Sequence, residues 1–167
     1  LNNSVQEKKI DISREVEDFE IRNKMQFHEE QKKAIEQAVN YGVSVITGGP
    51  GTGKTTIVKC IIEILKQNGE EVLLLAPTGR AAKRLADSTG AEAKTIHRML
   101  GVAYNDEESG RQKFEKNESD PIEADVVIID EASMVDMQLF NSLLKAIEPG
   151  TRLILVGDSS QLPSVAA

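Results

Sequence analysis

The sequence contains a single cysteine, Cys60, and no apolar run that approaches the roughly 18 residues of a membrane span. One thiol cannot form an intramolecular disulfide. Its place among isoleucines predicts a buried structural side chain rather than a reactive one. We expect no signal peptide at the start of the chain. We therefore expect a cytoplasmic protein with no membrane association.

The chain also lacks an excess of basic residues. It has 20 Lys and Arg against 27 Asp and Glu, a formal net charge of −7 and a pI of about 5.0. This excludes a strongly basic coat, although a local positive field would still allow DNA binding. Its 167 residues, 40% hydrophobic and 28% charged, indicate one globular domain. We expect a polar lead-in over residues 1–26, helical or partly disordered, before a single lobe over 27–167.

A complete phosphate-binding loop (Walker A), G-x-x-x-x-G-K-[ST], occupies residues 48–55. A β-branched run at 43–47 precedes it, and apolar residues at helical spacing follow over 56–66. Glycines let backbone N–H groups approach a phosphate, and the helix that opens there adds a partial positive charge. Lys54 would contact the β- and γ-phosphates, and the Thr55 hydroxyl would bind Mg²⁺. The alternative is a glycine-rich turn without a ligand. The residues expected to hold ATP in this loop are Gly49, Pro50, Gly51, Thr52, Gly53, Lys54, Thr55 and Thr56.

Strand and helix patterns alternate along the chain. Buried strands are predicted at 43–47, 72–76, 126–129 and 153–156. Helices are predicted at 28–40, 56–66, 80–86, 95–100 and after a capping box formed by Ser133 and Asp136. This order predicts an α/β fold of three layers, with a parallel sheet and helices on both faces. Residues 105–125 hold eight acidic and three basic side chains without an apolar pattern, so a solvated, mobile insertion is expected there.

Polar residues follow the third and fourth predicted strands, where parallel sheets bind their ligands. Asp130 could hold Mg²⁺ through its outer shell, and the adjacent Glu131 could accept a proton from an attacking water. The alternative for this pair is a solvated surface. Gln161 lies in the turn after the fourth strand. Its amide could sense a γ-phosphate, and a plain polar turn is an equal alternative.

A locally basic region follows the second predicted strand. Between Arg80 and Arg98 there are five basic and two acidic residues, in a chain of net negative charge. A helix N-terminus, a hydroxyl and an arginine suit nucleic-acid phosphates, whereas a solvated face is the simpler alternative. His97 lies outside any Cys/His cluster, which argues against zinc. The residues expected to contact nucleic acid are Pro77, Thr78, Gly79, Arg80, Thr95, His97 and Arg98.

Taken together, these motifs resemble superfamily 1 DNA helicases of the RecD-like branch, which moves 5′ to 3′. The resemblance runs from Gln31 to Val165, and Gln31 matches the family's adenine-reading glutamine. The matching motifs are residues 48–56 (motif I), 76–82 (motif Ia), 95–98, 130–133 (motif II) and 156–163 (motif III). The resemblance implies a RecA-like P-loop NTPase lobe that couples ATP hydrolysis, with Mg²⁺, to movement on single-stranded DNA. It also implies recombination or repair subunits as partners, as for an exonuclease V alpha subunit.

The family pattern continues beyond the motifs present here. Its members carry a second RecA-like lobe with motifs IV to VI and an arginine that reaches the γ-phosphate, whereas this sequence stops at Ala167. We therefore expect a first motor lobe that is incomplete as an enzyme. A nucleotide-gated binding module without turnover of its own is the main alternative. An unrelated P-loop ATPase or kinase is disfavoured by the motifs at 76–80 and 157–161.

Overall fold

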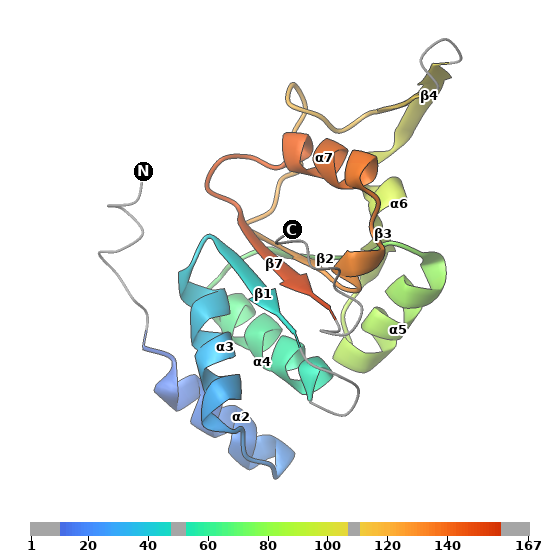
Figure 1. Ribbon diagram of the computed structural model, residues 1–167. Helices are drawn as coiled ribbons and strands as arrows, with labels where there is room; N and C mark the ends of the chain where they lie inside the picture. Colours follow the sequence, from blue (N-terminus) through green and yellow to red (C-terminus); the bar gives the residue numbers. More distant parts are fainter. Residues whose placement is uncertain (1–10, 48–52, 107–110, 158–167) are drawn as a thin grey trace, which may run out of the picture.

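Five parallel strands form the central sheet in the computed structural model of the protein (Figure 1). The structure describes residues 11–47, 53–106 and 111–157. The strands lie in the order β1-β7-β6-β2-β3, so the predicted parallel sheet is confirmed. Their bounds are β1 (Val43–Ile46), β2 (Val72–Ala76), β3 (Ala93–Thr95), β6 (Val126–Ile129) and β7 (Arg152–Val156).

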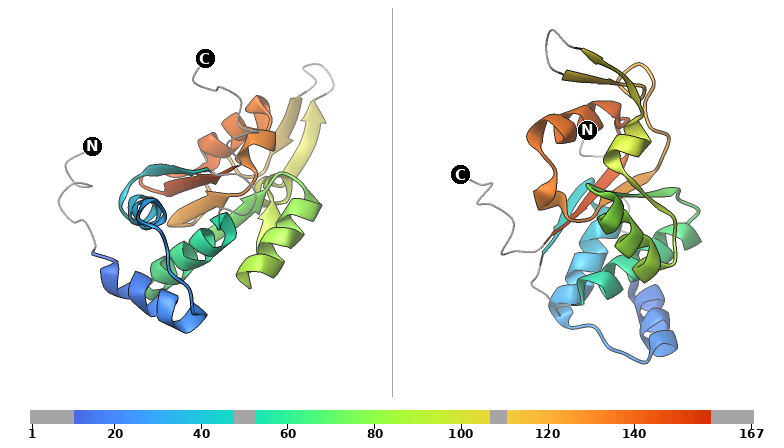
Figure 2. Two further views of the ribbon diagram at one scale, coloured as in Figure 1. Left: turned by 60° about the horizontal axis from the view of Figure 1, so that its bottom comes forward. Right: turned by 90° about the vertical axis from the view of Figure 1, so that its right-hand side faces the viewer.

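Helices cover both faces of this sheet (Figure 2). The first core contains side chains of α2 (Ser13–Asn23), α3 (Glu29–Asn40), α4 (Lys54–Gln67) and α5 (Gly79–Thr89). The second contains side chains of α6 (Ile96–Leu100) and α7 (Met137–Ala146).

Strand β6 shows how one apolar run serves both cores. All four of its residues are fully buried. Val126 and Ile128 belong to the first core, whereas Val127 and Ile129 belong to the second. Successive side chains of a strand point to opposite faces, so a continuous apolar strand needs helices on both sides. The predicted three-layer α/β fold is confirmed.

Two regions differ from the sequence prediction. β3 is a short strand of intermediate burial that pairs with β2. It was not predicted, because its sequence contains no apolar run. The segment 105–125 was predicted to lack regular structure, but β4 (Val102–Asp106) and β5 (Arg111–Phe114) form an antiparallel hairpin. Figures 1 and 2 show this hairpin projecting from the α/β body. Phe114 and Ile122 anchor the segment, because both pack into the second core.

The predicted capping box of Ser133 and Asp136 is wrong. Ala132–Met134 forms a separate 3₁₀ turn, and Asp136 itself caps α7. The Asp136 carboxylate accepts a hydrogen bond from the backbone N–H of Leu139 at 2.8 Å. An acidic side chain bonded to a free N–H of the first turn stabilises a helix start. The N-cap of the helix is therefore Asp136, three residues after the predicted Ser133.

The described part of the lead-in is an integral helix. Ile12, Val16 and Phe19 are all buried in the first core. The Phe19 ring stacks on that of Phe27, with centroids 5.8 Å apart. Within the predicted lead-in the structure has a helix at Ser13–Asn23, whereas residues 1–10 lie outside the described residues. Within the described ranges, no helix has the length and apolar character needed to cross a bilayer.

Candidate nucleotide and DNA sites

The phosphate-binding loop leads into the first turn of α4, as predicted. Gly53 has a φ of +79°, in the left-handed region that favours glycine. A Cβ added there would lie 3.1 Å from Nε2 of Gln31. Lys54, Thr55 and Thr56 then form the first turn of the helix. Gly49, Pro50, Gly51 and Thr52 lie outside the described residues.

Lys54 joins α4 to the end of β7. Its Nζ donates a hydrogen bond to the carbonyl oxygen of Gly157 at 3.2 Å. The backbone N–H of Gly157 in turn donates to the carbonyl of Ile46, at the end of β1. Adjacent parallel strands therefore place the lysine, the loop helix and the β7 end at one site. This hydrogen bond directs the partly buried ammonium toward the end of β7.

Asp130 and Glu131 follow β6 and diverge from each other. The Asp130 carboxylate accepts a hydrogen bond from the Glu131 backbone N–H at 2.9 Å. Burial raises the pKa of Asp130 and the neighbouring charge of Glu131 raises it further, whereas this hydrogen bond and the charges of Lys54 and Arg84 lower it. Glu131 has a φ of +51°, an uncommon left-handed conformation for a non-glycine residue. That conformation sends its side chain to Arg84, where Oε1 and Nη2 are 3.4 Å apart.

These groups line one cleft of about 600 Å³. Its charged residues are Lys54 from α4, Arg84 and Asp87 from α5, and Asp130 and Glu131 after β6. Within the described ranges, no group of three His, Cys, Asp or Glu residues could hold a metal. Magnesium needs no such cluster, because it keeps several waters and binds one or two carboxylates plus phosphate oxygens.

The donor set of the cleft suits that hard cation. Asp130 is a partly buried carboxylate, and burial raises its pKa. Thr55, an exposed residue, lines the same cleft. Both groups offer oxygen ligands. They are therefore the residues that would hold Mg²⁺, and the ion would relieve the burial of the carboxylate charge.

A second cavity, of about 870 Å³, lies on the other side of the loop helix. Gln31 and Phe27 line it, together with Gly53 and Thr56 of the loop region. The Gln31 Oε1 accepts a hydrogen bond from the His28 backbone N–H at 2.8 Å, which fixes the side chain at the start of α3. The structure therefore brings the predicted adenine-reading residue next to the end of the phosphate loop. A separate cavity of about 820 Å³ between α2 and α3 contains none of the predicted site residues.

The predicted DNA residues gather where β2 and β3 end. Thr78 is the N-cap of α5, and its hydroxyl accepts from the Ala81 N–H at 3.1 Å. Thr95 is the N-cap of α6, and its hydroxyl accepts from the Arg98 N–H at 3.1 Å. Each threonine therefore stabilises the start of its own helix.

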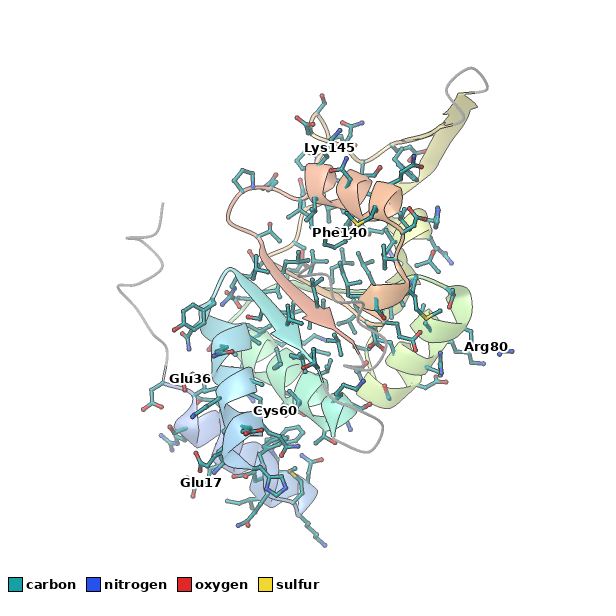
Figure 3. All side chains as sticks on the ribbon, viewed as in Figure 1. Glu17, Glu36, Cys60, Arg80, Phe140 and Lys145 are labelled. Atoms are coloured by element: carbon teal, nitrogen blue, oxygen red, sulfur yellow. The ribbon has the colours of Figure 1, made fainter. Side chains whose placement is uncertain are left out.

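The charged and aromatic members of this group face solvent. Arg80, His97 and Arg98 are exposed, and Pro77 is half-buried. In Figure 3 the Arg80 side chain extends away from α5 into solvent. The His97 ring lies 6.2 Å from that of Phe114 in a tilted arrangement, which ties α6 to the base of the hairpin. Gly79 opens α5, and a Cβ there would meet nothing within 4 Å.

Two features of the site were not predicted. Arg84 was counted only among the basic residues of its segment, and the structure pairs it with Glu131. The carbonyl of Gly157 is the partner of Lys54. The spacing of four residues between Arg80 and Arg84 places both on one side of a helix, but only the docking of α5 shows which group faces the cleft. Gln161, the predicted γ-phosphate sensor, lies outside the described residues.

The chain is similar to helicases of known sequence and structure. It is 45% identical over 139 residues to the ATP-dependent RecD2 DNA helicase of Deinococcus radiodurans, covering 83% of this chain and 18% of the relative. It is 38% identical over 162 residues to the RecBCD enzyme subunit RecD of Mycobacterium tuberculosis, covering 83% and 27%. The crystal structure of Bacteroides Pif1 in complex with ADP-AlF4 superposes with a TM-score of 0.56 at 29% identity, covering 84% and 34%.

The chain thus spans about a fifth to a quarter of the length of these two relatives. A family model described as an AAA domain matches residues 31–167, most of the sequence. The five-stranded parallel sheet with flanking helices agrees with that assignment. The chain belongs to the AAA domain family and is a homologue of the RecD, RecD2 and Pif1 helicases.

Proposed function

We propose that this chain is the ATP-binding motor lobe of a DNA helicase, which couples ATP hydrolysis to translocation on single-stranded DNA. The observation that carries the proposal is the convergence of Lys54, Asp130 and Glu131 on one cleft at the carboxyl ends of the strands. A cation for phosphate, a carboxylate for Mg²⁺ and a second carboxylate for water are the groups that phosphoryl transfer requires. The homology to RecD2 and RecD agrees with it.

Each residue of the cleft has a proposed role. Lys54 contacts the β- and γ-phosphates, and backbone N–H groups of residues 49–56 surround them. Thr55 and Asp130 hold Mg²⁺, which neutralises charge on the phosphates when bound. Glu131 accepts a proton from the attacking water. Gln161 senses the γ-phosphate, and Gln31 contacts the adenine from the second cavity.

The DNA path is proposed to cross the ends of β2 and β3. Pro77, Gly79 and the two threonine caps shape a backbone surface, and Arg80, His97 and Arg98 supply exposed donors. A motor that moves along any sequence must rely on phosphate contacts and stacking rather than on base edges. A second RecA-like lobe of the parent polypeptide would complete the ATP site, and recombination or repair subunits would be further partners.

The first test is nucleotide binding by this chain. Isothermal titration calorimetry with ADP and Mg²⁺ should show binding, and Lys54→Ala should weaken it by about two orders of magnitude or more. The loss follows because Lys54 places its charge on the β/γ-phosphates. Lys66→Ala, at the exposed far end of the same helix, is the control and should bind as the unmodified chain does. Equal affinities of the two variants would refute a nucleotide site at this loop.

The second test is turnover. The isolated chain should hydrolyse ATP slowly, because an arginine supplied across the cleft contributes roughly 10³- to 10⁵-fold in related enzymes. The full polypeptide should hydrolyse ATP faster when single-stranded DNA is added. Rapid DNA-stimulated hydrolysis by the isolated chain would contradict the need for a second lobe. Binding without hydrolysis in the full polypeptide would favour the nucleotide-gated module.

A further inference from the structure

One contact links the helix of the proposed DNA surface to the proposed catalytic carboxylate. The Nη2 of Arg84 donates to Oε1 of Glu131 at 3.4 Å. Arg84 lies on α5, the helix whose first turn carries Thr78 as its cap and Arg80 on its exposed side. A single helix of 11 residues therefore contacts both regions. A rigid shift of α5 at its N-terminal end would move the Arg84 guanidinium relative to Glu131.

The geometry of this contact is that of a weak, reversible pair. The Arg84 side chain is 65% exposed and that of Glu131 is 29% exposed, and their separation is long for a hydrogen bond. Exposed pairs of this kind contribute little to stability. The contact is therefore poorly suited to supporting the fold, but it can be broken at little cost.

The surroundings of Glu131 explain why such a weak contact matters. Its backbone is fixed by the left-handed φ and by the N–H donated to Asp130. Its side-chain oxygen Oε1 accepts the hydrogen bond from Arg84. The other charged residues that line the cleft are Lys54, Asp87 and Asp130. Lys54 is bonded to Gly157, so Arg84 is the cation that pairs with the Glu131 side chain among the described residues of the cleft.

We infer that Arg84 is a restraining residue, which holds the Glu131 carboxylate in the absence of DNA and releases it when DNA engages the N-terminal end of α5. A carboxylate oxygen that accepts from a guanidinium has less freedom to align on the attacking water. Binding of a DNA backbone at Thr78 and Arg80 would shift α5 and open the pair. The inference rests on the proposed role of Glu131 and adds a route by which DNA stimulates hydrolysis.

The test measures ATP hydrolysis by the full polypeptide with and without saturating oligo-dT. Arg84→Ala should raise the DNA-free kcat by about two- to fivefold, the range expected for loss of an exposed ion pair. The rate at saturating DNA should stay the same, so the stimulation ratio should fall by the same factor. ADP affinity should not change. Arg84→Lys keeps a cation at this position and should retain a low DNA-free rate.

Three comparisons make the result decisive. Lys66→Ala removes an exposed cation from α4 and should leave both rates unchanged. An unchanged DNA-free rate in Arg84→Ala, or a fall in both rates, would overturn the inference, since a fall would mean that Arg84 supports Glu131 instead of restraining it. Glu131→Gln tests the underlying role separately. If that variant hydrolysed ATP at the normal rate, the proposed function of Glu131 would fail, whatever Arg84 does.

Discussion

The proposed nucleotide cleft (the nucleotide end) and the proposed DNA surface at the ends of β2 and β3 (the DNA end) both lie at carboxyl ends of strands, but they are built in different ways. At the nucleotide end, contacts distant in sequence hold the functional groups, as between Lys54 and Gly157. At the DNA end, the hydroxyls of Thr78 and Thr95 bond to N–H groups three residues away, and the cations extend into solvent. The first region is preorganised by the whole fold, and the second is assembled from local sequence. Substitutions should therefore change chemistry at one end, and helix stability or salt dependence at the other.

The largest effect is expected for Glu131→Gln in the full polypeptide. The amide keeps the shape of the side chain but cannot take a proton from water, so kcat should fall by about 10²- to 10⁴-fold. ATP affinity should stay near normal. Single-turnover hydrolysis and equilibrium binding, measured on the same preparation, check both halves. Loss of ATP binding in this variant would mean that Glu131 acts in holding the nucleotide.

Asp130→Asn should act on the metal-dependent part of binding instead. Burial raises the pKa of Asp130, with the charge of Glu131 adding to the effect, so the folded state resists ionisation of this carboxyl. Its contribution to stability is present below the unfolded pKa and is lost as pH rises through the folded pKa. At neutral pH the neutral amide should therefore leave the thermal stability of the ligand-free chain unchanged or raised. The dependence of ADP affinity on Mg²⁺ concentration should become weaker.

Titrations of Mg²⁺ at fixed ADP separate Asp130→Asn from Glu131→Gln. We expect a weakened magnesium response in the first variant and a normal one in the second. If the two variants gave the same titration curve, the assigned division between metal holding and proton transfer would be wrong.

Arg80→Ala probes the DNA end. Its exposed guanidinium should neutralise one phosphate, so its loss should flatten the salt dependence of single-stranded DNA binding by about one unit. Affinity should fall similarly for unrelated sequences. Fluorescence anisotropy of labelled oligonucleotides over a salt series checks this in a polypeptide long enough to bind. Lys66→Ala is the matched control. An unchanged slope, or a loss confined to one base sequence, would place Arg80 outside the DNA path.

The sequence correctly predicted the strands that coincide with apolar runs. Strands β1, β2, β6 and β7 were predicted to within a residue at either end, because strands of a parallel sheet are short runs rich in Val, Ile and Leu. The predicted burial of β1 is wrong, because β1 is an edge strand in which Val43 and Val45 are exposed. β3 was missed because it contains Lys94 and Thr95, and its pairing depends on the neighbouring β2. The hairpin of β4 and β5 was missed because its strands, VAYND and RQKF, show no regular alternation of apolar and polar residues. Turn type and loop length fix the register of a hairpin, and a search for apolar patterns does not detect them.

The prediction of the candidate site rested on a topological rule, and it missed a residue that the rule does not cover. Ligands bind outside the carboxyl ends of parallel strands, so residues after strands were expected together, and Lys54, Asp130 and Glu131 do line one cleft. Arg84 lies in the second turn of α5, where the rule says nothing. Its partner depends on how α5 docks on α4 and on the left-handed turn at Glu131. Neither follows from the local sequence.

The smallest effect separates the cap from the cation at the DNA end. Thr78→Ala removes the oxygen that accepts from the Ala81 N–H. It should lower the free energy of unfolding by about 1 kcal/mol, or Tm by about 2–4 °C. Thr78→Ser keeps the hydroxyl and should lose little. Arg80→Ala, two residues away on the exposed side of the same helix, should leave the stability within ~0.5 kcal/mol of the original. Urea unfolding followed by circular dichroism measures all three variants under one condition. If Thr78→Ala and Arg80→Ala had equal stabilities, the hydroxyl would not be acting as a cap, and the DNA end would not be the locally built surface that distinguishes it from the nucleotide end.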